Sequence, residues 1–223
     1  MAEKVIIGDA ELYLGDCLDV LPMLGKVDAV VTDPPYNVCL GSNHHSKRQH
    51  GYSNSTDNLD AEQYYIFLKP IIDLCVSANL ALVTPGNGNE RLWPKPIWTM
   101  AWLKKNGVAR TPLTLGQKMN HSCWEPILVY GKLLNPPKHD IIDCSISMQT
   151  DAEGHPCPKP LRLLEWLVSL TEGTILDPFM GSGTTGVAAL KLGRKFIGIE
   201  IDEGYFKIAV ERISKEANQL KMF

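Results

Sequence analysis

A stiff acidic turn directly after a buried strand constrains this chain more than any other feature. The β-branched apolar run 27–32 predicts a strand, and Asp33-Pro34-Pro35-Tyr36 follows it at once. Because proline fixes φ and has no backbone N–H, the strand cannot continue past Asp33. The turn therefore presents a carboxylate, a rigid carbonyl and an aromatic ring at one strand end. A planar base with an exocyclic amino group needs such acceptors and such a ring, although a solvated Asp-Pro turn would have the same sequence.

Alternation of strands and helices extends from this turn to both ends of the chain. The patterns predict strands at 11–15, 27–32, 79–84, 127–130, 174–176 and 195–200. They predict helices at 17–24, 61–77, 160–170, 184–192 and 203–215, and a tryptophan-rich helix at 96–105 whose Trp98 and Trp102, with Trp93, are expected in the core or at an interface. Such alternation predicts an α/β domain with a doubly wound, mostly parallel sheet. Residues 107–151 give a weak pattern and are expected to form a small irregular insertion.

Composition narrows the class of protein. A chain of 223 residues that is 44% hydrophobic suits one domain over residues 1–223. Its N-terminus has no signal-peptide pattern and no apolar stretch is long enough to span a membrane, so we expect a cytoplasmic protein. Six scattered cysteines without a CxxC pair favour reduced thiols and argue against a metal site.

A formal net charge of −3 does not by itself indicate a nucleic-acid-binding protein. Contacts with phosphate would have to come from local patches. One candidate is the polar segment 41–58, which holds Lys47 and Arg48 and is expected to be a mobile loop close to the acidic turn. A surface loop without a binding role would look the same.

A second site is predicted near the C-terminus. The strand at 174–176 leads into Asp177 and the glycine-rich turn Gly181–Gly186, and Glu200 ends the next strand. This spacing is typical of a turn that approaches a ligand, with an acid placed to accept ribose hydroxyls. NAD is the usual ligand of such a turn, but a carboxylate at Asp177 would repel a pyrophosphate and suits an amino acid's ammonium group. No lysine follows Gly183, which excludes a P-loop, and S-adenosylmethionine fits both ends of the site better.

Three segments, in this order, resemble the amino-group DNA methyltransferases of the β arrangement, in which the catalytic motif precedes the cofactor motif. They are Asp33–Tyr36, residues 155–160 (HPCPKP) and residues 177–185 (DPFMGSGTT). Residues 14–17 and 124–130 extend the resemblance over most of the chain. It implies a Rossmann-like fold and methyl transfer from S-adenosylmethionine to a base flipped out of double-stranded DNA. Residues 107–151 would then be a reduced target-recognition segment.

The resemblance also implies roles for individual residues. In the catalytic turn Asp33-Pro34-Pro35-Tyr36, the Asp33 carboxylate and the Pro34 carbonyl would accept the amino hydrogens of the base, and Tyr36 would stack on its ring. Around the cofactor, Glu200 would bind ribose, and Asp16 beside Cys17 would meet the adenine amino group. Helix capping is the alternative role for Asp16, and Asp202 is expected to cap the last helix. The other residues expected at the cofactor are His155, Lys159, Asp177, Phe179, Gly181, Ser182, Gly183, Thr184 and Thr185.

Several functional alternatives stay open at this point. Aspartate at the first motif position favours adenine N6 as the acceptor, with cytosine N4 as the close alternative. A DNA-binding module without catalysis and an NAD-dependent oxidoreductase are the alternatives from other classes. The resemblance further suggests a homodimer and a cognate restriction endonuclease as partners.

Overall fold

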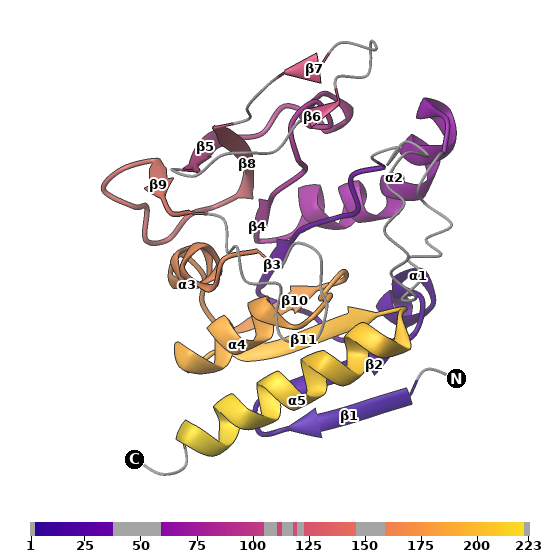
Figure 1. The fold of residues 1–223 in the computed structure, drawn as a ribbon, viewed down its shortest axis with the longest axis vertical. Coiled ribbons are helices and arrows are strands. Elements are labelled where there is room, and N and C mark those ends of the chain that lie inside the picture. The colour runs from indigo at the N-terminus through magenta and orange to yellow at the C-terminus, as the bar shows by residue number, and fades with distance from the viewer. Residues whose placement is uncertain are drawn as a thin grey trace.

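The computed structural model describes residues 3–37, 59–104, 111–112, 118–119, 123–145 and 159–220. Within these residues the main sheet has nine strands in the order β1-β2-β11-β10-β3-β4-β8-β5-β9 (Figure 1). The strands are β1 (Glu3–Ile7), β2 (Ala10–Leu14), β3 (Ala29–Thr32), β4 (Leu80–Val83), β5 (Trp98–Leu103), β8 (Trp124–Gly131), β9 (Ile141–Asp143), β10 (Thr174–Asp177) and β11 (Lys195–Glu200). Two short strands, β6 (Thr111–Pro112) and β7 (Lys118–Met119), pair separately.

The middle of the sheet is parallel. Strands β2, β11, β10, β3 and β4 run in one direction, each paired with the next. Outside them, β1 and β8 pair antiparallel with β2 and β4, β5 pairs antiparallel with β8, and β9 runs parallel to β5. The prediction of a mostly parallel α/β sheet is therefore confirmed.

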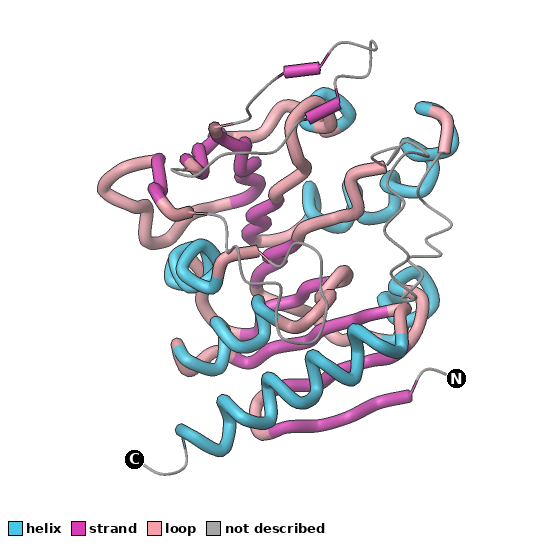
Figure 2. Tube along the Cα trace, viewed as in Figure 1, coloured by secondary structure: helices cyan, strands magenta, loops and turns pink. Residues whose placement is uncertain are grey.

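Helices cover both faces of the sheet, as Figure 2 shows. One face carries α3 (Leu161–Ser169), α4 (Thr184–Lys191) and α5 (Glu203–Leu220). The other carries α1 (Cys17–Val20) and α2 (Ala61–Ser77), with the short 3-10 helices η1 (Leu21–Met23) and η2 (Glu90–Leu92). Helix α5 continues to Leu220, beyond the predicted end at Lys215.

Side chains of β3 show why the central strands are mostly apolar. Ala29 and Val31 pack into the core beneath α3, α4 and α5, whereas Val30 packs into the core beneath α2. Successive side chains of a strand point to opposite faces, so a strand covered on both faces needs an apolar residue at every position. The resulting apolar run Ala29–Val31 is the signal that the sequence carries within residues 27–32.

The helix predicted at 96–105 is wrong. Residues Trp98–Leu103 form strand β5, which lies between β8 and β9. Met100 and Trp102 are buried, whereas Thr99 and Leu103 are exposed and Ala101 is half-buried, so burial alternates from Thr99 to Leu103. Aromatic side chains favour pleated surfaces, and β5 has both of its edges paired in the sheet. The paired neighbours decide the strand, and they come from segments distant in the sequence.

Parallel strands bring several polar residues to one edge of the sheet, because their carboxyl ends all lie on the same side. Asp33 follows β3, Thr84 follows β4, Asp177 ends β10 and Glu200 ends β11. This edge contains both predicted sites.

Two further predictions concern segments away from this edge. The predicted mobile loop 41–58 lies outside the described residues. Of the predicted insertion 107–151, strands β8 and β9 belong to the main sheet. In the described part of the chain, no helix combines the length and the apolar character that crossing a membrane requires.

Candidate active site

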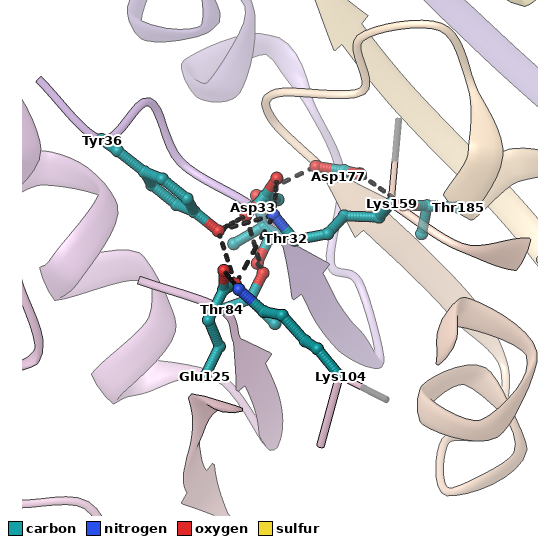
Figure 3. A network of polar contacts seen from close by, with 9 residues as sticks. All are labelled: Thr32, Asp33, Tyr36, Thr84, Lys104, Glu125, Lys159, Asp177 and Thr185. Atoms are coloured by element: carbon teal, nitrogen blue, oxygen red, sulfur yellow. Dashed lines mark hydrogen bonds and ion pairs between the residues drawn. The ribbon is translucent and has the colours of Figure 1, made fainter. Parts of the chain in front are cut away.

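The carboxylate of Asp33 lies at the centre of a polar network at the sheet edge (Figure 3). Its Oδ1 atom accepts hydrogen bonds from the Tyr36 hydroxyl at 2.6 Å and from the Thr84 hydroxyl at 2.8 Å. Thr84 follows β4, the strand beside β3, so the neighbouring strand fixes the carboxylate from one side. Neutral hydroxyl donors leave the negative charge of Asp33 in place.

The turn that carries Tyr36 is braced by α2 and by the segment after β4. Tyr64 of α2 donates its hydroxyl to the Pro35 carbonyl, and Asn89 Nδ2 donates to the Tyr36 carbonyl at 2.9 Å. Gly86 has φ +76°, and a Cβ there would lie 3.0 Å from the Tyr36 ring carbons. The ring therefore packs directly against backbone, where only glycine leaves room for it.

The Tyr36 phenol is kept protonated by its surroundings. Burial first, and then the charges of Asp33 and Glu125, raise the pKa of Tyr36 well above its ordinary value. Loss of the phenol proton would place a third negative charge beside these two carboxylates. The hydroxyl is therefore available as a donor to Asp33.

Two lysines and a second acid complete the network. Lys159 Nζ donates to Asp33 Oδ2 at 2.7 Å and to the Tyr36 hydroxyl oxygen at 2.5 Å, and it lies 4.0 Å from Glu125 Oε2. Glu125 Oε1 in turn forms an ion pair with Lys104. Lys104 is 5% exposed and Glu125 is 9% exposed, so both charges are removed from water and each depends on its partner.

Asp177, at the end of β10, is engaged by groups within the protein. Its Oδ1 accepts from the Thr32 hydroxyl at 2.9 Å and from the Phe179 backbone N–H at 3.1 Å, and its Oδ2 accepts from the Thr185 hydroxyl at 2.7 Å. Burial raises the pKa of Asp177 to about 6 against these three hydrogen bonds, which lower it, and the Asp33 charge adds to the increase. Asp177 is 2% exposed, and its hydrogen bonds to Phe179 and Thr185 stabilise the two ends of the glycine-rich turn.

The glycine-rich turn takes a backbone shape that favours glycine. Gly181 has φ +54° and Gly183, which precedes α4, has φ +80°. A Cβ at Gly183 would lie 2.9 Å from Ala209 Cβ of α5, so the turn and the last helix are in close contact. Phe179 at the start of the turn lies against Phe67, with ring centroids 6.1 Å apart.

Arg212 of α5 forms hydrogen bonds with two hydroxyl groups of this turn. Its Nη1 donates to the Ser182 carbonyl and hydroxyl oxygens, both at 2.7 Å, and to Thr184 Oγ1 at 3.2 Å. Ser182, Thr184 and Thr185 are all buried, and Thr185 bonds Asp177. The sequence pattern suggested these hydroxyls as cofactor donors, and in the structure they bind groups of the protein.

Glu200 connects the glycine-rich turn to α5. Its Oε2 accepts from the Gly181 N–H at 2.9 Å and its Oε1 accepts from the Asp202 N–H at 2.8 Å. Burial raises the pKa of Glu200, and these backbone hydrogen bonds oppose the increase. Asp202 Oδ1 accepts from the Tyr205 N–H at 2.8 Å, which confirms the predicted cap of the last helix.

Asp16 lies beside β11 and caps α1. Its Oδ1 accepts from the Leu18 N–H at 2.9 Å, while the N–H of the preceding Gly15 donates to the Glu200 carbonyl at 2.9 Å. Asp16 thus lies next to the residue that pairs with Glu200, at the same sheet edge. The neighbouring Cys17 is buried, and burial raises the pKa of its thiol to about 12, so it stays protonated and unreactive.

The two predicted sites converge. Strands β3 and β10 are adjacent in the sheet, and the Thr32–Asp177 hydrogen bond at 2.9 Å joins the residue before Asp33 to the start of the glycine-rich turn. Segments about 145 positions apart in the chain thus share one edge. The acidic turn and the glycine-rich turn therefore lie together at one sheet edge, and the individual roles of their residues remain predictions.

Several residues of this site carried no clear signal in the sequence. Thr84, Tyr64, Asn89 and Arg212 occupy ordinary helical, strand or loop positions, and only their contacts reveal them. Glu125 stood within the segment 124–130 that carries the family resemblance, without a role. Three predicted residues lie outside the described residues: His155, Lys47 and Arg48. Across the described part of the chain, no cluster of three or more His, Cys, Asp or Glu side chains could hold a metal ion.

Solved structures with this fold include several DNA methyltransferases. The M1.HpyAVI complex with S-adenosylmethionine is 24% identical, with a TM-score of 0.60 over 92% of this chain and 98% of that one. The cytosine-N4-specific PvuII DNA methyltransferase is 18% identical, with a TM-score of 0.64 over 96% of this chain and 93% of that one. At these identities the likeness establishes the fold.

Sequence comparison gives the family. A segment of 65 residues is 55% identical to the Type II methyltransferase M2.DpnII of Streptococcus pneumoniae, covering 28% of this chain and 24% of that protein. A segment of 69 residues is 48% identical to M.ScaI of Streptomyces caespitosus, covering 30% and 23%. The matches thus span about a quarter of these relatives' length. The N6/N4 DNA methylase family model matches residues 84–211, more than half of the chain, and the chain therefore belongs to the DNA methylase family.

Proposed function

We propose that this protein transfers a methyl group from S-adenosylmethionine to the exocyclic amino group of a base in double-stranded DNA, with adenine N6 as the acceptor. One observation carries the proposal: the Asp33 turn and the glycine-rich turn meet at the same sheet edge, joined by the Thr32–Asp177 hydrogen bond. A methyl acceptor held by one turn can then face a methyl donor held by the other. Proximity of this kind supplies much of the rate enhancement of a displacement reaction.

The residues at the cofactor side fit S-adenosylmethionine. Glu200 ends β11 with its carboxylate held by two backbone N–H groups, and we assign it as the acceptor of the ribose hydroxyls. Asp16 on the same edge is the acceptor for the adenine amino group, and the positive-φ turn at Gly181 and Gly183 brings backbone close to the ligand. When bound, S-adenosylmethionine supplies an electrophilic methyl group on a sulfonium centre.

On the acceptor side, this chain orients the base and its amino group. Asp33 and the Pro34 carbonyl accept the two amino hydrogens, which turns the nitrogen lone pair toward the methyl group. Tyr36 stacks on the base ring. The methyl group would pass to the amino nitrogen while the bonding pair stays on sulfur, and the nitrogen would then give one proton to water. No cysteine nucleophile takes part.

Adenine is favoured over cytosine by the aspartate at the first position of the catalytic motif, which in the resembling enzymes goes more often with adenine N6. Cytosine N4 presents the same two amino hydrogens to Asp33 and is the second candidate. Relatives named as Type II methyltransferases support a role in restriction and modification, with a cognate endonuclease as partner. We place the protein in the cytoplasm, where the chromosome is the substrate, and expect a homodimer.

Methyl transfer is tested with label from the cofactor. Purified protein is incubated with plasmid DNA and methyl-labelled S-adenosylmethionine, and Asp33→Ala is compared with Asp73→Ala, a control that removes a carboxylate 61% exposed on α2. We expect Asp33→Ala to lose label incorporation by about 100-fold or more, because the amino group is no longer oriented, while Asp73→Ala keeps it. Sequencing of modified bases in a host expressing the chain then gives the base and its site. A parent protein that binds DNA and transfers no label would contradict the proposal and favour a non-catalytic DNA-binding module.

A further inference from the structure

The ammonium group of Lys159 makes one of the contacts that the proposed mechanism gives to the amino group of a base, the hydrogen bond to the Asp33 carboxylate. Its Nζ donates to Asp33 Oδ2 at 2.7 Å and to the Tyr36 hydroxyl oxygen at 2.5 Å. Lys159 reaches this position from the segment before α3, 126 residues further along the chain than Asp33. Its side chain is only 14% exposed. A nitrogen donor already occupies the carboxylate to which the substrate's nitrogen has to bind.

Charge explains why an ammonium group is there when no base is bound. Asp33 and Glu125 lie on either side of Tyr36, and Lys104 neutralises only Glu125. Without Lys159, the Asp33 carboxylate would keep, among the described residues, the neutral donors Tyr36 and Thr84 alone. A partly buried carboxylate is costly without a cation or several donors, so Lys159 stabilises the base-free site.

Glu125 offers Lys159 a second acceptor. The Nζ atom is 2.7 Å from Asp33 Oδ2 and 4.0 Å from Glu125 Oε2. A shift of roughly 1 Å would bring Nζ within hydrogen-bond distance of Glu125, since such bonds are about 2.7–2.9 Å long. Lys104 holds Glu125 Oε1 and leaves Oε2 facing Tyr36 and Lys159.

We propose that Lys159 is an amine placeholder: it occupies Asp33 and Tyr36 while no base is bound, and the amino group of the entering base displaces it onto Glu125. The inference rests on the proposed function and deepens it by naming how the site distinguishes an amino-bearing base. A base without the amino group cannot displace the ammonium group. Lys159 therefore competes with the amino group for Asp33, and Lys159 and Glu125 are positioning residues: Lys159 lowers the preference for an amino-bearing base, and Glu125 limits that effect by receiving the displaced ammonium group.

Binding of matched duplexes tests the placeholder. The probe is a duplex with the site found by sequencing, carrying either the target base or its analogue without the amino group: purine for adenine, pyrimidin-2-one for cytosine. Affinities are measured with S-adenosylhomocysteine present, which prevents turnover. We expect Lys159→Met to increase the preference for the amino-bearing base about tenfold. The amino group then binds Asp33 without a competing ammonium group, and a tenfold change corresponds to about one charge-assisted hydrogen bond. Lys159→Arg, which keeps the charge, should return the preference toward that of the parent.

Glu125→Gln should have the opposite effect on this preference, which is the ratio of the affinity for the amino-bearing duplex to the affinity for the duplex without the amino group. Glutamine keeps an oxygen for Lys104 and removes the charge that would receive Lys159, so displacement becomes harder and the preference for the amino-bearing base falls. An unchanged ratio in this variant would overturn the transfer to Glu125. Thermal unfolding checks that each variant is folded. A general loss of stability would not raise the ratio in one variant and lower it in the other.

Failure of the placeholder is distinguishable from failure of the proposed function. The parent is first tested for methyl transfer to the same duplex; absence of transfer overturns the proposed function. Intact transfer with an unchanged ratio in Lys159→Met overturns the placeholder alone. The family resemblance instead implies that Lys159 lies at the cofactor. That role predicts weaker S-adenosylmethionine binding in Lys159→Met, measured by calorimetry, with the ratio of the two duplex affinities unchanged. The placeholder predicts unchanged cofactor affinity.

Discussion

At the scale of single residues, the site is built from side chains whose protonation is decided by burial. The Tyr36 phenol is held as a donor because burial and two carboxylates raise its pKa. Asp177 is an acid with three hydrogen-bond donors, and its pKa still rises to about 6 because it is buried. Both residues were identified from motifs, but their electrostatic state follows from neighbours distant in the chain.

Replacement of the Tyr36 ring should affect the base more than the cofactor. We expect Tyr36→Ala to lower methyl transfer by about 10- to 100-fold, since stacking of one base on an aromatic ring is worth roughly 1–3 kcal/mol. Cofactor affinity, measured by calorimetry, should stay the same because the ring belongs to the Asp33 turn. An equal loss in cofactor affinity would show that Tyr36 acts on the donor side.

The raised pKa of Asp177 predicts a pH-dependent stability. The folded value of about 6 lies above the ordinary 3.8, so the native state binds the proton more tightly than the unfolded chain. This contribution to stability is complete below pH 3.8 and is lost as the pH rises through about 6. The free energy of unfolding is measured in urea at pH 4 and at pH 7. We expect the parent to lose more stability between the two pH values than Asp177→Asn, and the difference between the two losses should be roughly 3 kcal/mol at most. Parallel stability curves would refute the assignment.

At the scale of elements, the glycine-rich turn depends on the last helix. Ala209 and Ile213 of α5 lie against Gly183, and Arg212 from the same helix holds Ser182 and Thr184. The turn is therefore shaped by residues of the last helix that lie more than twenty positions further along the chain. Its glycines were visible in the sequence as a motif, whereas this packing against α5 was not.

Gly183→Ala should be more destabilising than a matched control. Gly193 also has a positive φ, +64°, but a Cβ there would meet nothing within 4 Å. Gly193→Ala should thus carry only the backbone strain of about 1–2 kcal/mol, while Gly183→Ala adds a clash with Ala209 at 2.9 Å. Urea unfolding should rank Gly183→Ala below Gly193→Ala in stability. Equal losses would mean that α5 moves away at little cost.

At the scale of the whole molecule, the charge is unfavourable for binding DNA. A formal net charge of −3 leaves the phosphate contacts to local groups of cations. Lys104 and Lys159 are engaged with acids inside the network, so they do not supply such a group. The sequence prediction that Lys47 and Arg48 contact phosphate concerns residues outside those described.

The Lys47 and Arg48 prediction is tested by salt dependence. We expect the double alanine variant to reduce the slope of log affinity against log salt concentration by about 1–2, since each lost phosphate contact removes about 0.9. Binding to DNA of different sequences should weaken equally. A slope equal to that of the parent would exclude these two residues from phosphate contact.

The sequence alone determined the features that depend on neighbouring residues. Runs of apolar residues located the central strands, the prolines after Asp33 ended β3, and the glycines after Asp177 marked the turn before α4, because φ restrictions and strand periodicity act over a few residues. Tertiary structure decided the rest. Strand β5 was mistaken for a helix because its partners β8 and β9 come later in the chain. Lys159 lies at Asp33 only because the sheet places β3 beside β10, and no local pattern determines which distant charges share a desolvated edge.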